Sequence, residues 1–158
     1  MPPKLTEEVR GILTSGKPAH LVTLNPDGSP QVSVVWIGLE GDEIVCAHIG
    51  EWRKIRNIRR DPRIALSIEA DQPHLAGLDG YLAITGTARI SQGGAPQLLR
   101  RLAAVYLGPG AELPWTREPP PGHVTYITVE RIVRPDAPNW YKPIPARPTR
   151  PDEQAISP

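Results

Sequence analysis

The sequence predicts a mostly β protein, a small antiparallel β-barrel with peripheral helices. Six stretches show the alternating or β-branched apolar composition of strands, and turn clusters such as residues 25–30 separate neighbouring stretches. Helical patterns interrupt the strands at three points, which is the element order of a barrel with helices packed outside it. The 158 residues are enough for one domain with its own core.

The elements are expected in the following order. A first helix begins after Thr6, whose hydroxyl can cap it, and stops at Gly16. A second helix, residues 51–60, ends before a proline, because the residue preceding proline is pushed out of helical geometry. A third helix lies within residues 91–108, and Gly86 indicates a bulge in the strand before it. The expected strands cover residues 20–24, 31–39, 44–49, 63–70, 81–90 and 123–135, with loops at 71–80 and 109–122.

The domain organisation predicted from composition is simple. Residues 1–142 are expected to form one folded domain, and the proline-rich residues 143–158 an extended or disordered tail. No apolar run is long enough to span a bilayer, and the first ten residues lack the apolar core of a signal peptide. The single cysteine, Cys46, cannot form an internal disulfide, so a cytoplasmic location is expected.

Charge and ligand spacing argue against several classes of function. The net charge is +1, so basic residues form a local patch, whereas nucleic-acid-binding domains are usually basic as a whole. A metal site is not expected, because the four histidines lack the spacing of metal ligands. Neither a nucleophile elbow nor a glycine-rich phosphate loop is present.

The second expected helix, residues 51–60, is the stretch around which the rest of the chain is organised. A glycine, Gly50, precedes it, so its free N–H groups face the end of a strand. A helix N-terminus with nearby cations suits an anion such as phosphate, although arginine-rich helices are also often only solvated, salt-bridged faces. A helical wheel places Trp52, Ile55 and Ile58 on an apolar side, Arg53, Arg56, Asn57 and Arg60 on a cationic side, and Lys54 at the edge between them.

The chain lacks evident reactive groups of its own, so a bound cofactor is expected to carry the chemistry. The hypothesis is an anionic cofactor whose phosphate rests on the basic helix. The strand at residues 31–39 adds a second expectation, because residues 34–37 are apolar without alternation. A strand that is apolar on both faces is covered on both, and in a domain this small a second subunit can supply the cover. A dimer is therefore predicted.

Three stretches together resemble a known family. They are TLNPDGSPQVSVVWI (residues 23–37), RKIRNIRRDPRIALSI (residues 53–68) and YLAITGTARI (residues 81–90). In this combination the sequence resembles the split β-barrel flavin and deazaflavin oxidoreductases, the relatives of pyridoxamine 5′-phosphate oxidase, over residues 5–133. The string from Lys54 to Arg63 is similar to the branch that uses the deazaflavin coenzyme F420.

The resemblance implies a homodimeric split barrel with its cofactor in a groove between subunits. It implies that Lys54 and Asn57 lie at the cofactor phosphate, with Arg53 and Arg56 as neighbours. Some relatives carry a basic residue two positions before the lysine, where this chain has Trp52. The resemblance also implies that Ser33, Val34, Val35 and Trp36 border the cofactor ring, and that Ile49 and Gly50 bring backbone N–H groups close to it.

The activity implied by the resemblance is hydride transfer between F420 and a small unsaturated or quinone-like acceptor, without a catalytic side chain. Trp140 is the first candidate to line the acceptor pocket, followed by Tyr81, Trp115 and Tyr141. Two alternatives stay open at this point. The protein could hold F420 or a flavin without turnover, or it could be an FMN-dependent oxidase or flavin reductase on the same fold.

Overall fold

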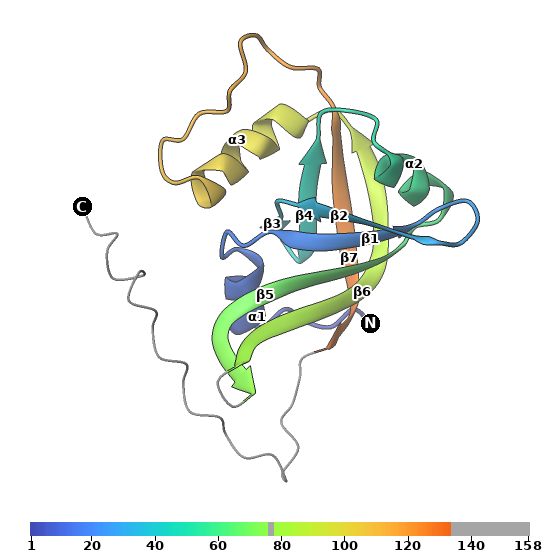
Figure 1. Cartoon of the computed structure of the whole chain (residues 1–158), viewed down its shortest axis with the longest axis vertical. Helices are drawn as coiled ribbons and strands as arrows, with labels where there is room; N and C mark the ends of the chain where they lie inside the picture. Colours follow the sequence, from blue (N-terminus) through green and yellow to red (C-terminus); the bar gives the residue numbers. More distant parts are fainter. Residues whose placement is uncertain (76–77, 134–158) are drawn as a thin grey trace.

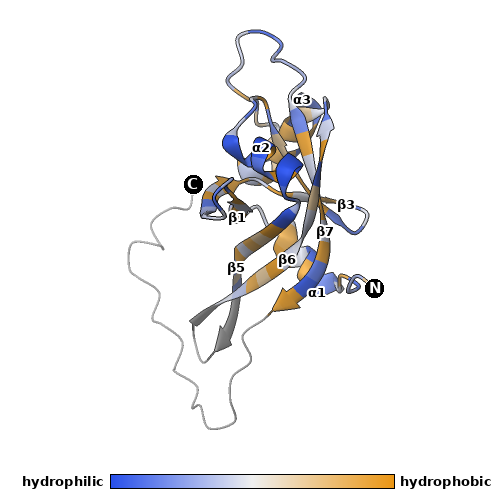
Figure 2. Cartoon of the chain, turned by 90° about the vertical axis from the view of Figure 1, so that its right-hand side faces the viewer, coloured by the Kyte–Doolittle hydropathy of each residue, from blue (hydrophilic) through white to orange (hydrophobic). Residues whose placement is uncertain are grey.

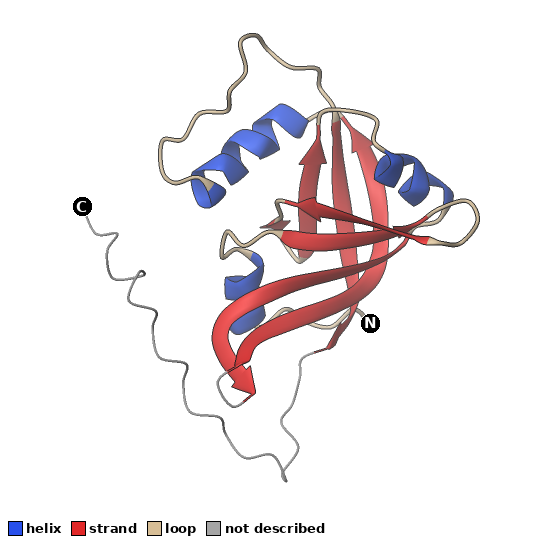
Figure 3. Ribbon diagram, viewed as in Figure 1, coloured by secondary structure: helices blue, strands red, loops and turns tan. Residues whose placement is uncertain are grey.

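The computed structural model describes residues 1–75 and 78–133. Within them, seven strands form one antiparallel sheet with the order β2-β1-β5-β6-β7-β4-β3. The sheet curls around a core, with α2 and α3 near its upper end and α1 lower, as Figures 1 and 3 show. The elements are α1 (Glu7–Leu13), β1 (Ala19–Leu24), β2 (Pro30–Val35), β3 (Gly38–Glu40), β4 (Glu43–His48), α2 (Arg53–Arg60), β5 (Arg63–Leu75), β6 (Leu78–Gln92), α3 (Ala95–Tyr106) and β7 (His123–Val133).

The predicted architecture of a mostly β barrel with three helices is confirmed. Thr6 caps α1 as expected, because its hydroxyl accepts a hydrogen bond from the Val9 backbone N–H at 3.3 Å. The main core fills the concave side of the sheet with aliphatic side chains such as Leu21, Ile44 and Ile84, none of them more than 1% exposed. Among the described residues, no helix is long and apolar enough to cross a membrane.

The strand expected at residues 31–39 is wrong as a single element. β2 ends at Val35 and β3 begins at Gly38, so two residues lie between the strands. The Trp36 ring stacks on Tyr106 of α3 with a centroid distance of 5.0 Å. The Tyr106 hydroxyl accepts from the Ile37 N–H and donates to the Lys17 carbonyl, each at 2.9 Å. The Ile37 N–H therefore bonds to a helix side chain instead of a neighbouring strand, and the strand breaks there.

The loop expected at residues 71–80 is also wrong. β5 continues to Leu75 and β6 begins at Leu78, so these strands form a long hairpin. Their pairing is irregular, with register shifts on either side of Pro73. Proline lacks the N–H that a regular ladder needs, so its presence suggested a loop where the chain instead forms an irregular ribbon.

The bulge expected at Gly86 is confirmed. The β6–β7 register shifts between Thr85 and Gly86. A Cβ atom at Gly86 would lie 2.1 Å from the Thr128 carbonyl oxygen, so only glycine allows the two strands to approach this closely. The predicted tail, residues 143–158, lies outside the described residues, as does the proposed domain boundary at 142.

Candidate anion-binding site

The candidate site begins where β4 gives way to α2. β4 ends at His48, and a tight turn follows in which the Trp52 N–H donates to the Gly50 carbonyl at 3.0 Å. Trp52 is the N-cap residue of α2 but offers no side-chain hydrogen bond, and the first turn of the helix contains no acidic residue. The positive end of the helix is therefore left without a side-chain acceptor. Figure 2 shows α2 as a mostly hydrophilic helix beside the more apolar strands.

The arginines in the second half of α2 are already engaged. Arg59 forms an ion pair with Glu51, and Arg60 donates to the Leu24 carbonyl and, at 3.0 Å, to the Asn57 side-chain oxygen. Arg56 donates to the Glu51 carbonyl at 2.8 Å. These side chains tie the helix to the neighbouring turns, which is a structural role.

Arg53 and Lys54, at the start of α2, differ from these arginines. Among the described residues, neither side chain forms an ion pair with a carboxylate. Lys54 is half-buried, and this burial lowers its pKa, with an opposing effect of the Cys46 thiol. A half-buried ammonium group without a counter-ion is electrostatically costly, so the site favours an incoming anion.

The groups next to Lys54 on the sheet do not supply a negative charge at neutral pH. Cys46 and His48 lie on the inner face of β4, with the thiol sulfur 3.5 Å from the His48 Nε2. Burial raises the pKa of Cys46 to about 11, so the thiol stays protonated at neutral pH. Burial, assisted by the charges of Lys54 and His123, lowers the pKa of His48 to about 3. Both groups are therefore uncharged at neutral pH, and neither of them offsets the positive charge of Lys54.

A cleft of about 670 Å³ lies on the other side of α2, against the β1–β2 turn. Arg53 belongs both to this cleft and to the open end of the helix, whereas Lys54 does not line it. The predicted cationic cluster is thus divided between two sides of the helix. The residues that line the cleft are Asn25, Pro26, Asp27, Ser29, Arg53, Arg56, Asn57 and Arg60.

The expectation that Asn57 lies on an exposed cationic face is wrong. Asn57 is only 1% exposed, and its amide nitrogen donates to the Thr23 hydroxyl at 3.0 Å and to the Asn25 side chain at 3.2 Å. The wheel also placed Trp52 on the apolar underside, but this side chain is 59% exposed. The first error arises because the β1–β2 turn packs against α2 and covers Asn57. The second arises because Trp52 is the N-cap residue and lies just outside the helix to which a wheel applies. The Asn57 side chain stabilises the β1–β2 turn through these hydrogen bonds. Its contact with a phosphate stays a prediction.

The strand predicted to border a cofactor ring presents alternate residues to opposite sides. Val34 is 61% exposed, whereas Val35 is 5% exposed and belongs to the core. Ser33 has a buried hydroxyl without a partner among the described residues, and Trp36 is half-buried against Tyr106. Because successive side chains of a strand point to opposite faces, the Val34 and Val35 side chains face opposite sides of β2, and the position of these four residues beside a cofactor ring stays a prediction.

The turn predicted to supply backbone N–H groups is more open. Ile49 and Gly50 are half-buried. A Cβ atom at Gly50 would come within 3.2 Å of the Trp52 ring, so the indole lies over this glycine at the mouth of the site. Sequence reasoning gave Trp52 no such place.

The candidates for an acceptor pocket are not gathered at α2. Trp115 lies under the Arg100 guanidinium, 5.2 Å from its ring centroid, in the segment after α3. Tyr81 is 44% exposed and lies opposite Glu69 in the β5–β6 hairpin, which extends downward in Figure 1 while α2 lies at the upper right. Trp140 and Tyr141 lie outside the described residues.

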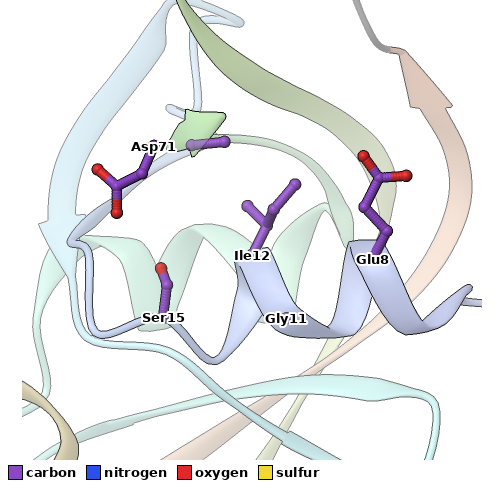
Figure 4. Close-up of a pocket in the computed structure, with 6 residues that line it drawn as sticks. Glu8, Gly11, Ile12, Ser15 and Asp71 are labelled. Atoms are coloured by element: carbon purple, nitrogen blue, oxygen red, sulfur yellow. The ribbon is translucent and has the colours of Figure 1, made fainter. Parts of the chain in front are cut away.

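The pocket beside α1 fits an anion less well. Figure 4 shows a pocket of about 490 Å³ between α1 and the outer part of β5. Glu8 and Asp71 supply its charged groups, and its lining contains no cation. In the part of the chain that the structure describes, histidine, cysteine, aspartate and glutamate side chains do not gather in any group that could hold a metal ion.

Sequence reasoning missed one residue pair at the site. The His123 Nε2 lies 3.0 Å from the Glu51 carboxylate, which joins the first residue of β7 to the turn before α2. The two positions are far apart in the sequence, and their contact depends on the β4–β7 register, in which His48 lies opposite His123. No local pattern could have revealed it.

Comparisons with known proteins identify the family and the fold. Residues 5–133 match the pyridoxamine 5′-phosphate oxidase family. A solved F420 reductase is 26% identical, with a TM-score of 0.64, over 83% of this chain and 98% of that chain. Two further structures share the fold: a conserved hypothetical protein from Mycobacterium tuberculosis (22% identity, TM-score 0.64, 85% and 86% coverage) and a putative pyridoxamine 5′-phosphate oxidase from Listeria innocua (18%, 0.63, 85% and 100%). No curated protein matches the sequence significantly.

Proposed function

This chain belongs to the pyridoxamine 5′-phosphate oxidase family of split barrels, and on that premise we propose that it is an oxidoreductase that uses coenzyme F420. The proposed reaction is hydride transfer between the deazaflavin and a small unsaturated or quinone-like organic acceptor. The likeness to an F420 reductase, at 26% identity over most of both chains, supports the deazaflavin over FMN.

The observation that carries the proposal is the open N-terminus of α2. Arg53 and Lys54 there have no carboxylate partner among the described residues, and the helix has no side-chain cap. A phosphate group would satisfy the helix N–H groups and the two cations together. The residue types present therefore fit the phosphate of a flavin or a deazaflavin.

In the proposed complex, the protein binds and orients while the cofactor supplies the hydride chemistry. Lys54 and Arg53 hold the phosphate, and the backbone of Ile49 and Gly50 borders the cofactor. Ser33, whose buried hydroxyl has no partner among the described residues, is the residue of β2 best suited to donate a hydrogen bond to a ring atom. Holding cofactor and acceptor in reactive geometry, away from water, supplies much of the rate enhancement in such reactions. Tyr81, Trp115 and Trp140 stay our candidates for the acceptor pocket.

We also propose that the protein is a homodimer built on the outer face of the sheet. Val32 and Val34 on the edge strand β2 are 59% and 61% exposed, and Val133 is 41% exposed. The register places Val34 opposite His20, and it places Val133 opposite Ala83. Val32 and Val34 form an exposed apolar patch on an edge strand, of the kind that a second subunit covers, whereas Val133 lies on β7, with three strands between.

The dimer can be tested with Val34→Asp. We expect the wild-type protein to sediment as a dimer and the variant as a monomer, because a carboxylate buried in an apolar interface is strongly unfavourable. Analytical ultracentrifugation measures the difference. A monomeric wild-type protein would overturn the dimer proposal.

The cofactor proposal is tested by titrating the purified protein with F420 and with FMN. We expect micromolar or tighter binding of F420 and oxidation of reduced F420 by at least one unsaturated or quinone-like acceptor. F420 binding without turnover would favour a non-catalytic binding protein. A yellow protein with tightly bound FMN would favour an FMN-dependent oxidase or flavin reductase, and binding of neither cofactor would overturn the proposal.

A further inference from the structure

Glu51 is the carboxylate next to the open end of α2, and both its carboxylate oxygens and its carbonyl oxygen have partners elsewhere. One carboxylate oxygen pairs with Arg59, near the far end of the helix. The other lies 3.0 Å from the His123 Nε2 on β7, and the Glu51 carbonyl accepts from Arg56. The residue immediately before the N-cap thus faces away from the N-terminus it adjoins.

This orientation opposes the local electrostatics. A carboxylate near a helix N-terminus is stabilised by the helix dipole, and Lys54 lies only three positions further along the chain. Arg53, also without a partner among the described residues, is closer still in sequence. A free Glu51 side chain would therefore turn toward these cations and neutralise the site. In the structure it does not, and Glu51 is not among the groups that shift the pKa of Lys54.

His123 is the better anchored of the two side chains that hold the Glu51 carboxylate. Its side chain is 12% exposed, whereas that of Arg59 is 46% exposed and gains less from an ion pair. The neighbouring Gly122 fixes the chain path, because it has a φ of +60° and a Cβ there would lie 2.4 Å from the His48 carbonyl oxygen. The imidazole is thus presented to Glu51 from a rigid position at the start of β7.

We propose that His123 is a positioning residue that holds the Glu51 carboxylate against β7, away from Lys54 and Arg53, and so keeps the anion site positively charged. The proposal deepens the proposed function and rests on it. His123 does not touch the ligand in this scheme; it acts by restraining a carboxylate that would otherwise compete with a phosphate for Lys54 and Arg53.

The test compares four variants with the wild-type protein: His123→Leu, His123→Gln, Glu51→Gln and the double variant His123→Leu/Glu51→Gln. F420, FMN and inorganic pyrophosphate serve as separate probes. We expect His123→Leu to weaken binding roughly tenfold, because a released carboxylate then lies against the cations of a partly buried site. His123→Gln should bind like the wild-type protein, since its amide N–H can still donate to Glu51.

The double variant is the decisive sample. Removing the charge of Glu51 should restore binding to within about twofold of Glu51→Gln alone, which a purely structural loss at His123 would not allow. A second readout needs no ligand: in the apoprotein, NMR titration of Lys54 should show a higher pKa in His123→Leu than in the wild-type protein, and the double variant should reverse the change. Thermal unfolding checks that each variant is folded.

The outcomes separate the two proposals. If the wild-type protein binds a cofactor but His123→Leu binds equally well, or if the double variant binds as weakly as His123→Leu, the role of His123 is overturned and the proposed function stands. If neither cofactor binds but pyrophosphate follows the expected order of affinities, the proposed function fails and the role of His123 stands. If none of the three probes binds to the wild-type protein, both are overturned.

Discussion

The two halves of α2 contain the same kinds of side chain but use them differently. In the second half, Arg59 and Arg60 are bound to a carboxylate, a carbonyl and an amide oxygen. In the first turn, Arg53 and Lys54 have no carboxylate partner among the described residues, and the adjoining N-terminus is uncapped. Residue type alone therefore does not show which cations of a helix are available to a ligand. The bonding partners of each side chain do.

Asp61, which directly follows α2, differs from Lys54 in the same way. Asp61 bonds to the backbone N–H and the guanidinium of Arg63, and these hydrogen bonds, above all those to the side chain, lower the pKa of Asp61 to about 2. Burial instead lowers the pKa of Lys54. Folding therefore favours the charged form of Asp61 and disfavours the charged form of Lys54. Only the second arrangement leaves a charge available for a ligand.

The largest expected effect comes from reversing the unpaired charge. We predict that Lys54→Glu weakens binding of F420 or FMN at least a hundredfold, because it replaces attraction by repulsion at a partly buried anion site. The fold should survive, since Lys54 is only half-buried. Cofactor titration with a circular dichroism spectrum measures both effects.

Arg63→Glu is the matched control for Lys54→Glu. It makes the same charge change at a residue whose cation is already paired with Asp61. We expect its cofactor affinity to stay within about threefold of the wild-type value, because surface charges are screened by salt. Equal losses in the two variants would mean that only overall charge matters, and the contrast between unpaired and paired cations would be refuted.

The second effect concerns the stability of the helix–turn contact. We predict that Asn57→Ala lowers the free energy of unfolding by about 1–3 kcal/mol, because it leaves the buried Thr23 hydroxyl and its neighbours without their amide donor. Urea unfolding measures the loss. Cofactor affinity, measured on the folded protein, should fall less in Asn57→Ala than in Lys54→Glu. A larger loss of affinity in Asn57→Ala would indicate that Asn57 contacts the cofactor phosphate.

Much of the fold could be predicted because it depends on local signals. Alternating apolar residues marked the strands, and Thr6 marked the start of α1 as the structure has it. The strand break after Val35 was missed because its cause, the Tyr106 hydroxyl, lies in α3. The hairpin through Pro73 was missed because proline is a turn signal in most contexts, and long-range pairing with β6 overrides it here.

The candidate site divides along the same line. The cationic character of the first turn can be read from the sequence, and the resemblance implied that Lys54 lies at the cofactor phosphate with Arg53 beside it. The Glu51–His123 contact and the burial of Asn57 could not be predicted, because each depends on which segments the sheet brings together. Helical periodicity assumes one buried side, but α2 is covered on two.

The smallest expected effect is the pH dependence of stability, which should differ between the paired Asp61 and the unpaired Lys54. Because the pKa of Asp61 is about 2 in the folded protein and near 4 in an unfolded chain, the unfolded state binds more protons between these values. The stabilisation from Asp61 is therefore complete above about pH 4 and is lost as the pH falls toward about 2. We predict that Asp61→Asn is slightly less stable than the wild-type protein at pH 6, and that the difference shrinks as the pH is lowered through this window.

Lys54 should show the opposite behaviour at high pH. Because folding lowers the pKa of Lys54, deprotonation of this side chain relieves a cost of folding. The stability of the wild-type protein relative to Lys54→Gln should therefore rise as the pH increases through the folded pKa of Lys54. Urea unfolding across both pH ranges measures the two differences, and a constant difference at high pH would show that Lys54 carries no unopposed charge for a ligand to use.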